Sequence, residues 1–360
     1  MPDDSSRRRA LLAPDAFKGT AAAPAVASAM DRGARRAGWD SDLCPLSDGG
    51  EGFAEVLAAV PGPTGAVAGS WHQTSVTGPL GEPVTARWWL ADGVAVVESA
   101  AASGLPLAGG ARGNDPLRAS TRGTGELLVA ASSAGARRVL VGVGGSATTD
   151  GGRGAIEVIE EAGGLGGVEV VVACDVETRF IGAAADFGPQ KGATPDQVVE
   201  LEARLVALAV DLRTRYGVDV TDLPGAGAAG GLAGGLAALG AVLVPGFEVV
   251  AAAVGLADRV ARADVVVTGE GRLDATSWSG KVVGSVLTAA SSAGVPVLVV
   301  VGGLGPGGLN GISAPEVVVR SLSDRFGEPR ALADPASCVE VVVADALGGL
   351  AGWAGPLTRK

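Results

Sequence analysis

Carboxylates and basic side chains gather in five short segments of this 360-residue chain, four of which contain glycine: PDAFKG, SDGGEG, CDV, FGPQKG and GEGRLD with SGK. The side chains in question are Asp15, Lys18, Asp48, Glu51, Asp175, Gln190, Lys191, Glu270, Arg272, Asp274 and Lys281. Carboxylates hold Mg²⁺ or accept a hydroxyl proton, lysines offset phosphate charge, and glycines let backbone N–H groups approach phosphate oxygens. The set favours phosphoryl transfer, although any one of these residues alone is equally typical of a helix cap or a turn.

These segments follow predicted strands. In the N-terminal part and the last third of the chain, runs such as ADVVVTGEG and VPVLVVVGG alternate with helical segments. This alternation predicts a mostly parallel sheet covered on both faces, and ligands bind where the strands of such sheets end. The middle differs, because it predicts a β-hairpin turning at Asp92-Gly93 and a long helix between Lys191 and Tyr216. We therefore expect a discontinuous domain of residues 1–69 and 245–360 and an inserted α/β domain of residues 70–244.

Several other chemistries find little support. GAGAAG at 225–230 and GVGGSA at 142–147 match dinucleotide-binding patterns, but the first does not follow a strand and the second lacks a convincing acidic partner. Gly280-Lys281 is followed by Val282, so a Walker A loop is absent. The single histidine, His72, argues against most histidine-based catalysis and zinc sites.

Composition limits the partners. A net charge of −11 argues against nucleic acid but leaves an anionic small-molecule substrate open, because a few lysines can dominate a cleft. Three scattered cysteines are typical of a reducing compartment, and no apolar export signal follows the N-terminal arginines. The uncharged stretch Gly225 to Pro245 is rich in glycine and alanine, which predicts a tightly packed internal helix. We expect a cytoplasmic protein without a membrane partner, either a monomer or a homodimer.

Eight segments together resemble, in order, the motifs of the bacterial type I glycerate kinase family. They are APDAFKGT, PLSDGGEGF, VESAAASGL, STRGTGELL, VGVGGSATTDGG, FGPQKGAT, GAGAAGGLAGGL and VVTGEGRLD. The resemblance implies an ATP-dependent kinase that uses Mg²⁺ to phosphorylate D-glycerate, usually at the 2-hydroxyl. It also implies two α/β domains: a flavodoxin-like parallel sheet built from both chain ends and an inserted mixed α/β domain, with the active site in the cleft between them.

Carried onto matching positions, the resemblance implicates most of the charged residues above, and their chemistry suggests roles. The predicted catalytic residues are Lys18, Asp48, Asp175 and Asp274, with Asp48 or Asp274 as the base that takes the hydroxyl proton. The predicted substrate-binding residues are Lys18, Lys191, Glu270 and Arg272, with Lys18 and Arg272 on the substrate carboxylate. The predicted ATP-binding residues are Gly144, Gly145, Ser146 and Lys281. The predicted Mg²⁺ ligands are Asp48, Glu51 and Asp175.

Two departures from the family pattern bear on the acceptor. The family usually has serine where this chain has Ala16, and its loop after the CDV segment is longer. The shortened loop here brings Arg179 and Phe180. A reshaped loop leaves open a paralogous kinase that acts on another small hydroxy compound in a biosynthetic pathway. A non-catalytic binding homologue is a separate alternative, against which the retained carboxylates and lysines argue.

Overall fold

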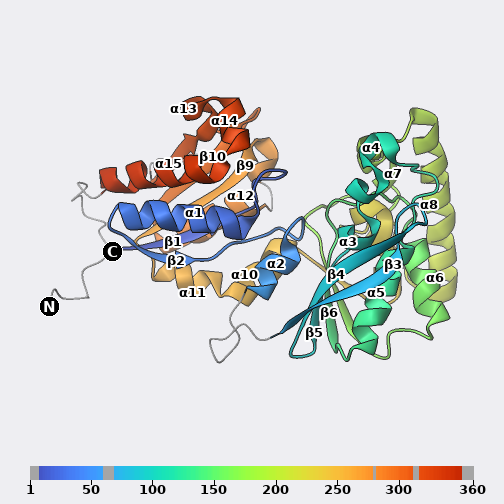
Figure 1. The fold of residues 1–360 in the computed structure, drawn as a ribbon. Coiled ribbons are helices and arrows are strands. Elements are labelled where there is room, and N and C mark those ends of the chain that lie inside the picture. The colour runs from blue at the N-terminus through green and yellow to red at the C-terminus, as the bar shows by residue number, and fades with distance from the viewer. Residues whose placement is uncertain (1–7, 60–68, 279–280, 311–315, 351–360) are drawn as a thin grey trace. The chain divides into compact units, whose positions relative to one another are not determined.

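The computed structural model describes residues 8–59, 69–278, 281–310 and 316–350, which form two compact units (Figure 1). Unit 1 comprises the chain up to Asp48 and from Phe247 onward, and unit 2 comprises Gly49–Gly246. The inserted unit thus begins earlier than the expected residue 70. The reason is helix α2 (Phe53–Ala58), which packs against strands β4 (Pro83–Ala91) and β5 (Val94–Glu98) of unit 2.

Unit 1 contains a five-stranded sheet in the order β11-β10-β9-β1-β2, and every neighbouring pair is parallel. Its strands are β1 (Arg9–Pro14), β2 (Asp40–Leu43), β9 (Val265–Leu273), β10 (Val297–Leu304) and β11 (Val317–Ser321). Counted within the unit, this is the flavodoxin order 2-1-3-4-5. The prediction of a flavodoxin-like sheet built from both chain ends is confirmed.

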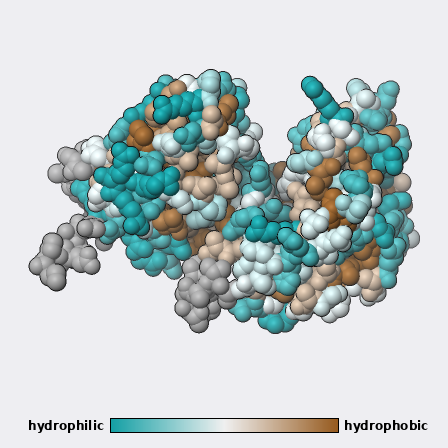
Figure 2. Space-filling model, in the orientation of Figure 1, coloured by the Kyte–Doolittle hydropathy of each residue, from teal (hydrophilic) through white to brown (hydrophobic). Residues whose placement is uncertain are grey.

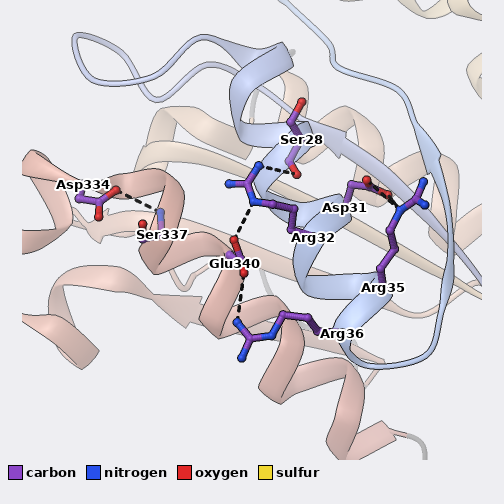
Figure 3. A network of polar contacts seen from close by, with 8 residues as sticks. All are labelled: Ser28, Asp31, Arg32, Arg35, Arg36, Asp334, Ser337 and Glu340. Carbon is purple, nitrogen blue, oxygen red and sulfur yellow. Dashed lines mark hydrogen bonds and ion pairs between the residues drawn. The ribbon is translucent and has the colours of Figure 1, made fainter.

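Helices cover this sheet. They are α1 (Ala23–Arg36), α10 (Gly246–Val254), α11 (Leu256–Ala261), η4 (Ala275–Trp278), α12 (Val282–Ala293), α13 (Leu322–Phe326), α14 (Glu328–Ala333) and α15 (Pro335–Leu350). α1 and α15 pack side by side, and Glu340 of α15 accepts hydrogen bonds from Arg32 Nε at 2.7 Å and Arg36 at 3.1 Å (Figure 3). Figure 2 shows hydrophilic side chains over part of this helix pair, while its inner face joins the core of unit 1.

Unit 2 contains a six-stranded mixed sheet in the order β3-β4-β5-β6-β7-β8. The strands not yet described are β3 (Ser70–Thr77), β6 (Arg138–Gly142), β7 (Glu169–Ala173) and β8 (Val242–Val244). β3, β4 and β5 pair antiparallel, and β5 to β8 pair parallel. The predicted hairpin is present: Asp92 and Gly93 between β4 and β5 have φ of 50° and 78°, as a type I′ turn requires. The prediction of a mixed second α/β unit is confirmed.

Helices also pack against the sheet of unit 2. Besides α2 they are α3 (Ala100–Ser103), η1 (Leu105–Ala108), α4 (Gly110–Gly113), α5 (Arg122–Ser133), α6 (Arg153–Glu161), α7 (Ala183–Phe187), η2 (Pro189–Lys191), α8 (Pro195–Tyr216), η3 (Ala228–Gly231) and α9 (Leu232–Ala238). The long helix α8 was predicted, and it begins at a capping box in which Thr194 and Gln197 bond each other's backbone N–H. The uncharged stretch forms η3, α9 and β8, and η3 and α9 are buried. Within the described residues, none of the helices has the length and apolarity needed to span a bilayer.

Candidate active site

A cavity of about 530 Å³ opens in unit 1 where strands β1 and β9 end. β1 and β9 are parallel neighbours at the centre of the sheet, at the point where the strand order reverses. In doubly wound sheets this switch point, at the carboxyl ends of the strands, is where ligands bind. Six residues predicted from the sequence line the cavity: Lys18, Asp48, Glu270, Arg272, Asp274 and Lys281.

The backbone after β1 presents Lys18 at the cavity. Asp15 N–H donates to the Gly269 carbonyl at 2.9 Å, which extends the pairing of β1 with β9. The chain then makes a tight turn in which Phe17 and Ala21 exchange backbone hydrogen bonds, with the Phe17 ring buried below. A Cβ on Gly271 would lie 3.2 Å from the backbone nitrogen of Lys18. Glycine at this position therefore lets the end of β9 approach the turn closely. Lys18 is left exposed at the tip.

Asp15 also lines the cavity, although the predicted site residues do not include it. Its side chain is only 6% exposed, and Oδ1 accepts a hydrogen bond from the Ala16 N–H at 2.7 Å. Burial raises the pKa of Asp15 to about 7, and repulsion from Asp48 adds to the rise. A general base works best when its pKa lies near the operating pH. The signal available in the sequence was the position of Asp15, directly after the first strand.

Glu270 provides a second buried carboxylate, at 9% exposure. Its Oε1 has no hydrogen-bond partner within the part of the chain that the structure describes. Burial raises the pKa of Glu270, while a hydrogen bond from Ser277 and the charge of Lys281 lower it in part. Buried polar atoms without partners are rare in folded proteins and call for an explanation. A group of a bound ligand would supply the missing partner.

Asp274 and Lys281 are joined through Thr276 on the other side of the cavity. Asp274 Oδ1 accepts hydrogen bonds from Thr276 N–H at 2.8 Å and Thr276 Oγ1 at 2.7 Å. Lys281 Nζ donates to Thr276 Oγ1 at 2.6 Å and stands at the N-terminus of α12. The hydrogen bonds from Thr276 lower the pKa of Asp274, so this carboxylate stays ionised and is a weak base.

The remaining predicted site residues belong to unit 2: Glu51, Gly144, Gly145, Ser146, Asp175 and Lys191. The loop with Gly144, Gly145 and Ser146 follows β6 and is held by the segment after α3. Leu105 N–H donates to the Gly145 carbonyl at 2.9 Å, and Gly104 and Ser146 form an isolated β-bridge. In this loop Gly145 is exposed and Ser146 is buried.

Several charged side chains of unit 2 bond to its own backbone. Lys191 is 3% exposed and its Nζ donates to the Thr148 carbonyl at 2.6 Å; burial lowers its pKa to about 7. Asp175 Oδ1 accepts from Gly246 N–H at 2.9 Å. Asp150, which is not among the site residues predicted from the sequence, accepts from Thr121 N–H and Oγ1, both at 2.8 Å, and from two N–H groups at the start of α6. It thereby caps α6 and holds the residue before α5, a structural role that its place in TTDGG did not reveal.

The described residues contain no group of three or more His, Cys, Asp or Glu side chains arranged to hold a metal ion. Mg²⁺ at phosphate-transfer sites needs fewer protein ligands, because one or two carboxylates act together with substrate phosphates and water. Asp15 and Asp48 line one cavity and lie near enough for Asp48 to raise the pKa of Asp15. One of these carboxylates, Asp48, is enough to fit a magnesium ion whose coordination is completed by phosphate and water.

The chain is similar to known kinases over most of its length. A model described as the glycerate kinase family matches residues 10–162 and 156–340, and kinases of this kind transfer a phosphoryl group to an alcohol. The chain belongs to the glycerate kinase family, which confirms the resemblance.

Similar proteins of this family span most of the chain. Glycerate 2-kinase of Escherichia coli K12 is 39% identical over 330 residues, covering 82% of this chain and 85% of that protein. Glycerate kinase of Bacillus subtilis 168 is 40% identical over 330 residues with the same coverage. A crystal structure assigned to glycerate kinase 2 of Salmonella typhimurium LT2 has 34% sequence identity and a TM-score of 0.78, and the match covers 96% of this chain and 99% of that one.

Proposed function

We propose that this protein is an ATP-dependent kinase that phosphorylates D-glycerate at its 2-hydroxyl, with Mg²⁺, in the cytoplasm. The observation that carries the proposal is the cavity at the β1–β9 switch point. It combines the cations Lys18, Arg272 and Lys281 with the buried carboxylates Asp15 and Glu270. A small anionic hydroxy acid and a phosphoryl group need this combination of charges. The names of the similar Escherichia coli and Bacillus subtilis proteins support the same acceptor.

Lys18 and Arg272 are the groups proposed to bind the substrate carboxylate. Both are exposed at the cavity, so their charges are available to a ligand. Arg272 presents a planar fork that matches a carboxylate, and Lys18 adds a compact charge. Glu270 can accept a hydrogen bond from a substrate hydroxyl. Lys191 is not among the proposed substrate contacts, because its side chain is buried and its Nζ donates to the Thr148 carbonyl.

Asp15 is the residue proposed to take the proton of the reacting hydroxyl. Asp274 is a weaker base because Thr276 holds its carboxylate. Asp48, the other carboxylate predicted as the base, is proposed to bind the metal instead. In the proposed step the hydroxyl oxygen forms a bond to the γ-phosphorus of ATP. The bond from that phosphorus to the bridging oxygen breaks, ADP leaves with the electron pair, and the proton passes to Asp15.

ATP and Mg²⁺ are the remaining ligands that the proposed reaction needs. We propose that Gly144, Gly145, Ser146 and Lys281 bind ATP phosphates, and that Asp48, with Glu51 and Asp175, supplies carboxylates to Mg²⁺. When bound, the ion neutralises charge that develops on the phosphate oxygens. The backbone of a glycine loop and a lysine at a helix N-terminus are both suited to phosphate oxygens.

The two residues that the shortened loop brings, Arg179 and Phe180, give no reason to replace glycerate as the proposed acceptor. Phe180 is fully buried in the core of unit 2, where it packs with Leu205 and Leu208. Arg179 is exposed and pairs with Asp222 at 2.8 Å. Internal packing and a surface ion pair therefore account for both residues. A kinase of another small hydroxy compound remains the second candidate, because the loop is shorter than in the family.

The test measures ADP release with MgATP across D-glycerate, L-glycerate, serine and other small hydroxy compounds, with phosphorus NMR on the product. We expect fast turnover of D-glycerate and a phosphate ester at the 2-position. Tight MgATP binding without glycerate turnover would transfer the proposal to another acceptor. Absence of both turnover and MgATP binding would favour a non-catalytic homologue.

A further inference from the structure

Helix α8 carries an apolar stripe that faces solvent. Val199, Val206 and Val210 are 67%, 43% and 63% exposed, and they are three of the ten exposed large hydrophobic residues in the described part of the chain. Ala203, also exposed, lies between them. The spacings of four, three and four residues place all four on one side of the helix, as in the seam of a coiled coil.

The opposite side of α8 is already covered. Leu201, Leu205, Leu208 and Leu212 are buried in the core of unit 2, together with Phe180. At 100° of rotation per residue, the apolar stripe, called the valine stripe below, points away from these leucines. Packing within unit 2 therefore explains one apolar face of α8 and leaves the other uncovered. Scattered single apolar residues need no explanation, but an ordered stripe on a regular helix suits another helix.

Charges beside the stripe indicate what covers it. Glu202 and Arg213 are exposed, and they are eleven positions apart, which is three turns plus about 20°. They therefore lie on the same edge of the stripe, about 16 Å apart along the axis. An antiparallel second copy of α8 would set Arg213 of each copy against Glu202 of the other. In a parallel pair the same edge of each helix would lie on opposite sides of the interface, so these two charges would not meet.

We propose that α8 is a self-association surface, on which two copies of this chain pack their α8 helices antiparallel about a two-fold axis. The valine stripes form the centre, and two symmetric Glu202–Arg213 pairs flank it. In the single chain Arg213 pairs with Asp219 at 3.2 Å, and both side chains are well exposed. Such surface pairs contribute at most about 1 kcal/mol, so exchanging the partner of Arg213 costs little.

The expected dimer is weak. α8 has 22 residues, and at 1.5 Å per residue it is about 33 Å long. One helix pair of this length gives an interface below the roughly 1,200–2,000 Å² of total surface that stable complexes bury. The association should therefore depend on protein concentration, with a stoichiometry of two as an isologous interface requires.

Sedimentation equilibrium over a wide concentration range tests the proposal. The mass should rise from 35.2 kDa towards twice that value. Val206→Glu and Val210→Glu should keep the protein monomeric, with unchanged circular dichroism. Leu309→Glu, at a residue of unit 1 that is 52% exposed, should leave the dimer intact as a matched control. A monomer at every concentration, or a dimer unaffected by both valine variants, would overturn the proposal.

Charge reversal tests the antiparallel arrangement. Arg213→Glu and Glu202→Arg should each weaken the dimer, and the two changes combined should restore it. Asp219→Asn should leave it unchanged, which separates the intermolecular pair from the one within the chain. A double variant as weak as either single variant would contradict the antiparallel pairing. The readout is mass, so the result is independent of the proposed kinase activity.

Discussion

The carboxyl ends of the two sheets use the same residue types in opposite ways. In unit 1, Asp15, Lys18 and Glu270 line a cavity, and Glu270 Oε1 has no hydrogen-bond partner among the described residues. In unit 2, Asp150 and Lys191 bond to backbone groups of their own unit. A charged residue at a strand end is therefore available to a ligand only where the local backbone leaves it unsatisfied. Residue type and spacing alone do not decide between the two cases.

The electrostatics show the same contrast. Burial moves the pKa of Asp15 and that of Lys191 each to about 7, from opposite sides. Asp15 shares a cavity with Asp48 and Lys18, whereas Lys191 is closed in with the Thr148 carbonyl and the nearby Asp150. A shifted pKa marks a candidate site, but buried structural groups show similar shifts. Substitutions can separate the two cases.

The largest effect is expected for Asp15→Asn. If Asp15 accepts the hydroxyl proton, kcat should fall about 10²- to 10⁴-fold, the usual contribution of a general base. Stability near neutral pH should rise, because burial of Asp15 penalises its ionised form, whereas asparagine is neutral, keeps the shape and can still accept from the Ala16 N–H. Steady-state ADP release and a urea melt measure the two quantities. Asp274→Asn should lose less activity, and full turnover by Asp15→Asn would remove it from the mechanism.

In unit 2 the pattern should reverse, with Asp150→Ala costing stability. Asp150 accepts four hydrogen bonds, which hold Thr121 and cap the start of α6. Losing a cap costs about 1 kcal/mol, and hydrogen bonds to a charged group about 1.5–3 kcal/mol, so we expect a loss of roughly 2–4 kcal/mol. Urea denaturation measures it.

The matched control for Asp150→Ala is Glu169→Ala, which removes an exposed partner of Arg138 in the same unit and should change stability by less than about 1 kcal/mol. Equal losses for the two variants would show that Asp150 has no special structural role.

Much of the fold followed from the sequence, because valine-rich runs and helical spacing are local signals. The hairpin at Asp92-Gly93 and the helix ending at Tyr216 were predicted in this way. Strand β3 was not, because most of its side chains are at least partly exposed and lack a clear alternation. The start of the insertion was placed too late because the contacts of α2 with β4 and β5 are not local.

The cavity in unit 1 was more predictable than the contacts in unit 2. Lys18 and Asp48, which were predicted from their positions after strands, line this cavity together with Glu270 in the last part of β9, since parallel strand ends share one edge. The burial of Lys191 depends on how segments far apart in sequence, at Thr148 and Asn114, fold against it. No pattern around Lys191 indicates that its ammonium bonds to a backbone carbonyl.

Lys191→Met should change the pH dependence of stability. The pKa of Lys191 is about 7 in the folded protein, against 10.5 for an unperturbed lysine. Between these values the unfolded chain binds the extra proton, so this group makes stability rise with pH across the window and fall as pH drops towards 7. The methionine variant should show a flatter dependence. Urea midpoints at neutral pH and near the upper end of the window measure it.

Turnover of the same variant tests its role directly. A buried structural lysine predicts that Lys191→Met keeps most of its activity per folded molecule. A large rise in KM for glycerate, with the pH dependence of stability unchanged, would instead return Lys191 to the substrate site and weaken the contrast between the two sheets.

The smallest effect is expected for Arg179→Ala in the shortened loop. The Arg179–Asp222 pair has side chains 65% and 86% exposed, so its loss should change stability by no more than about 1 kcal/mol and leave kcat and KM for D-glycerate unaltered. Phe180→Ala is the informative partner, since removing this buried ring should cost about 3–5 kcal/mol. If Arg179→Ala changed acceptor preference, the loop would select the substrate. Unit 2 would then contribute directly to acceptor specificity, and the contrast between a ligand-binding unit 1 and structural charges in unit 2 would not hold.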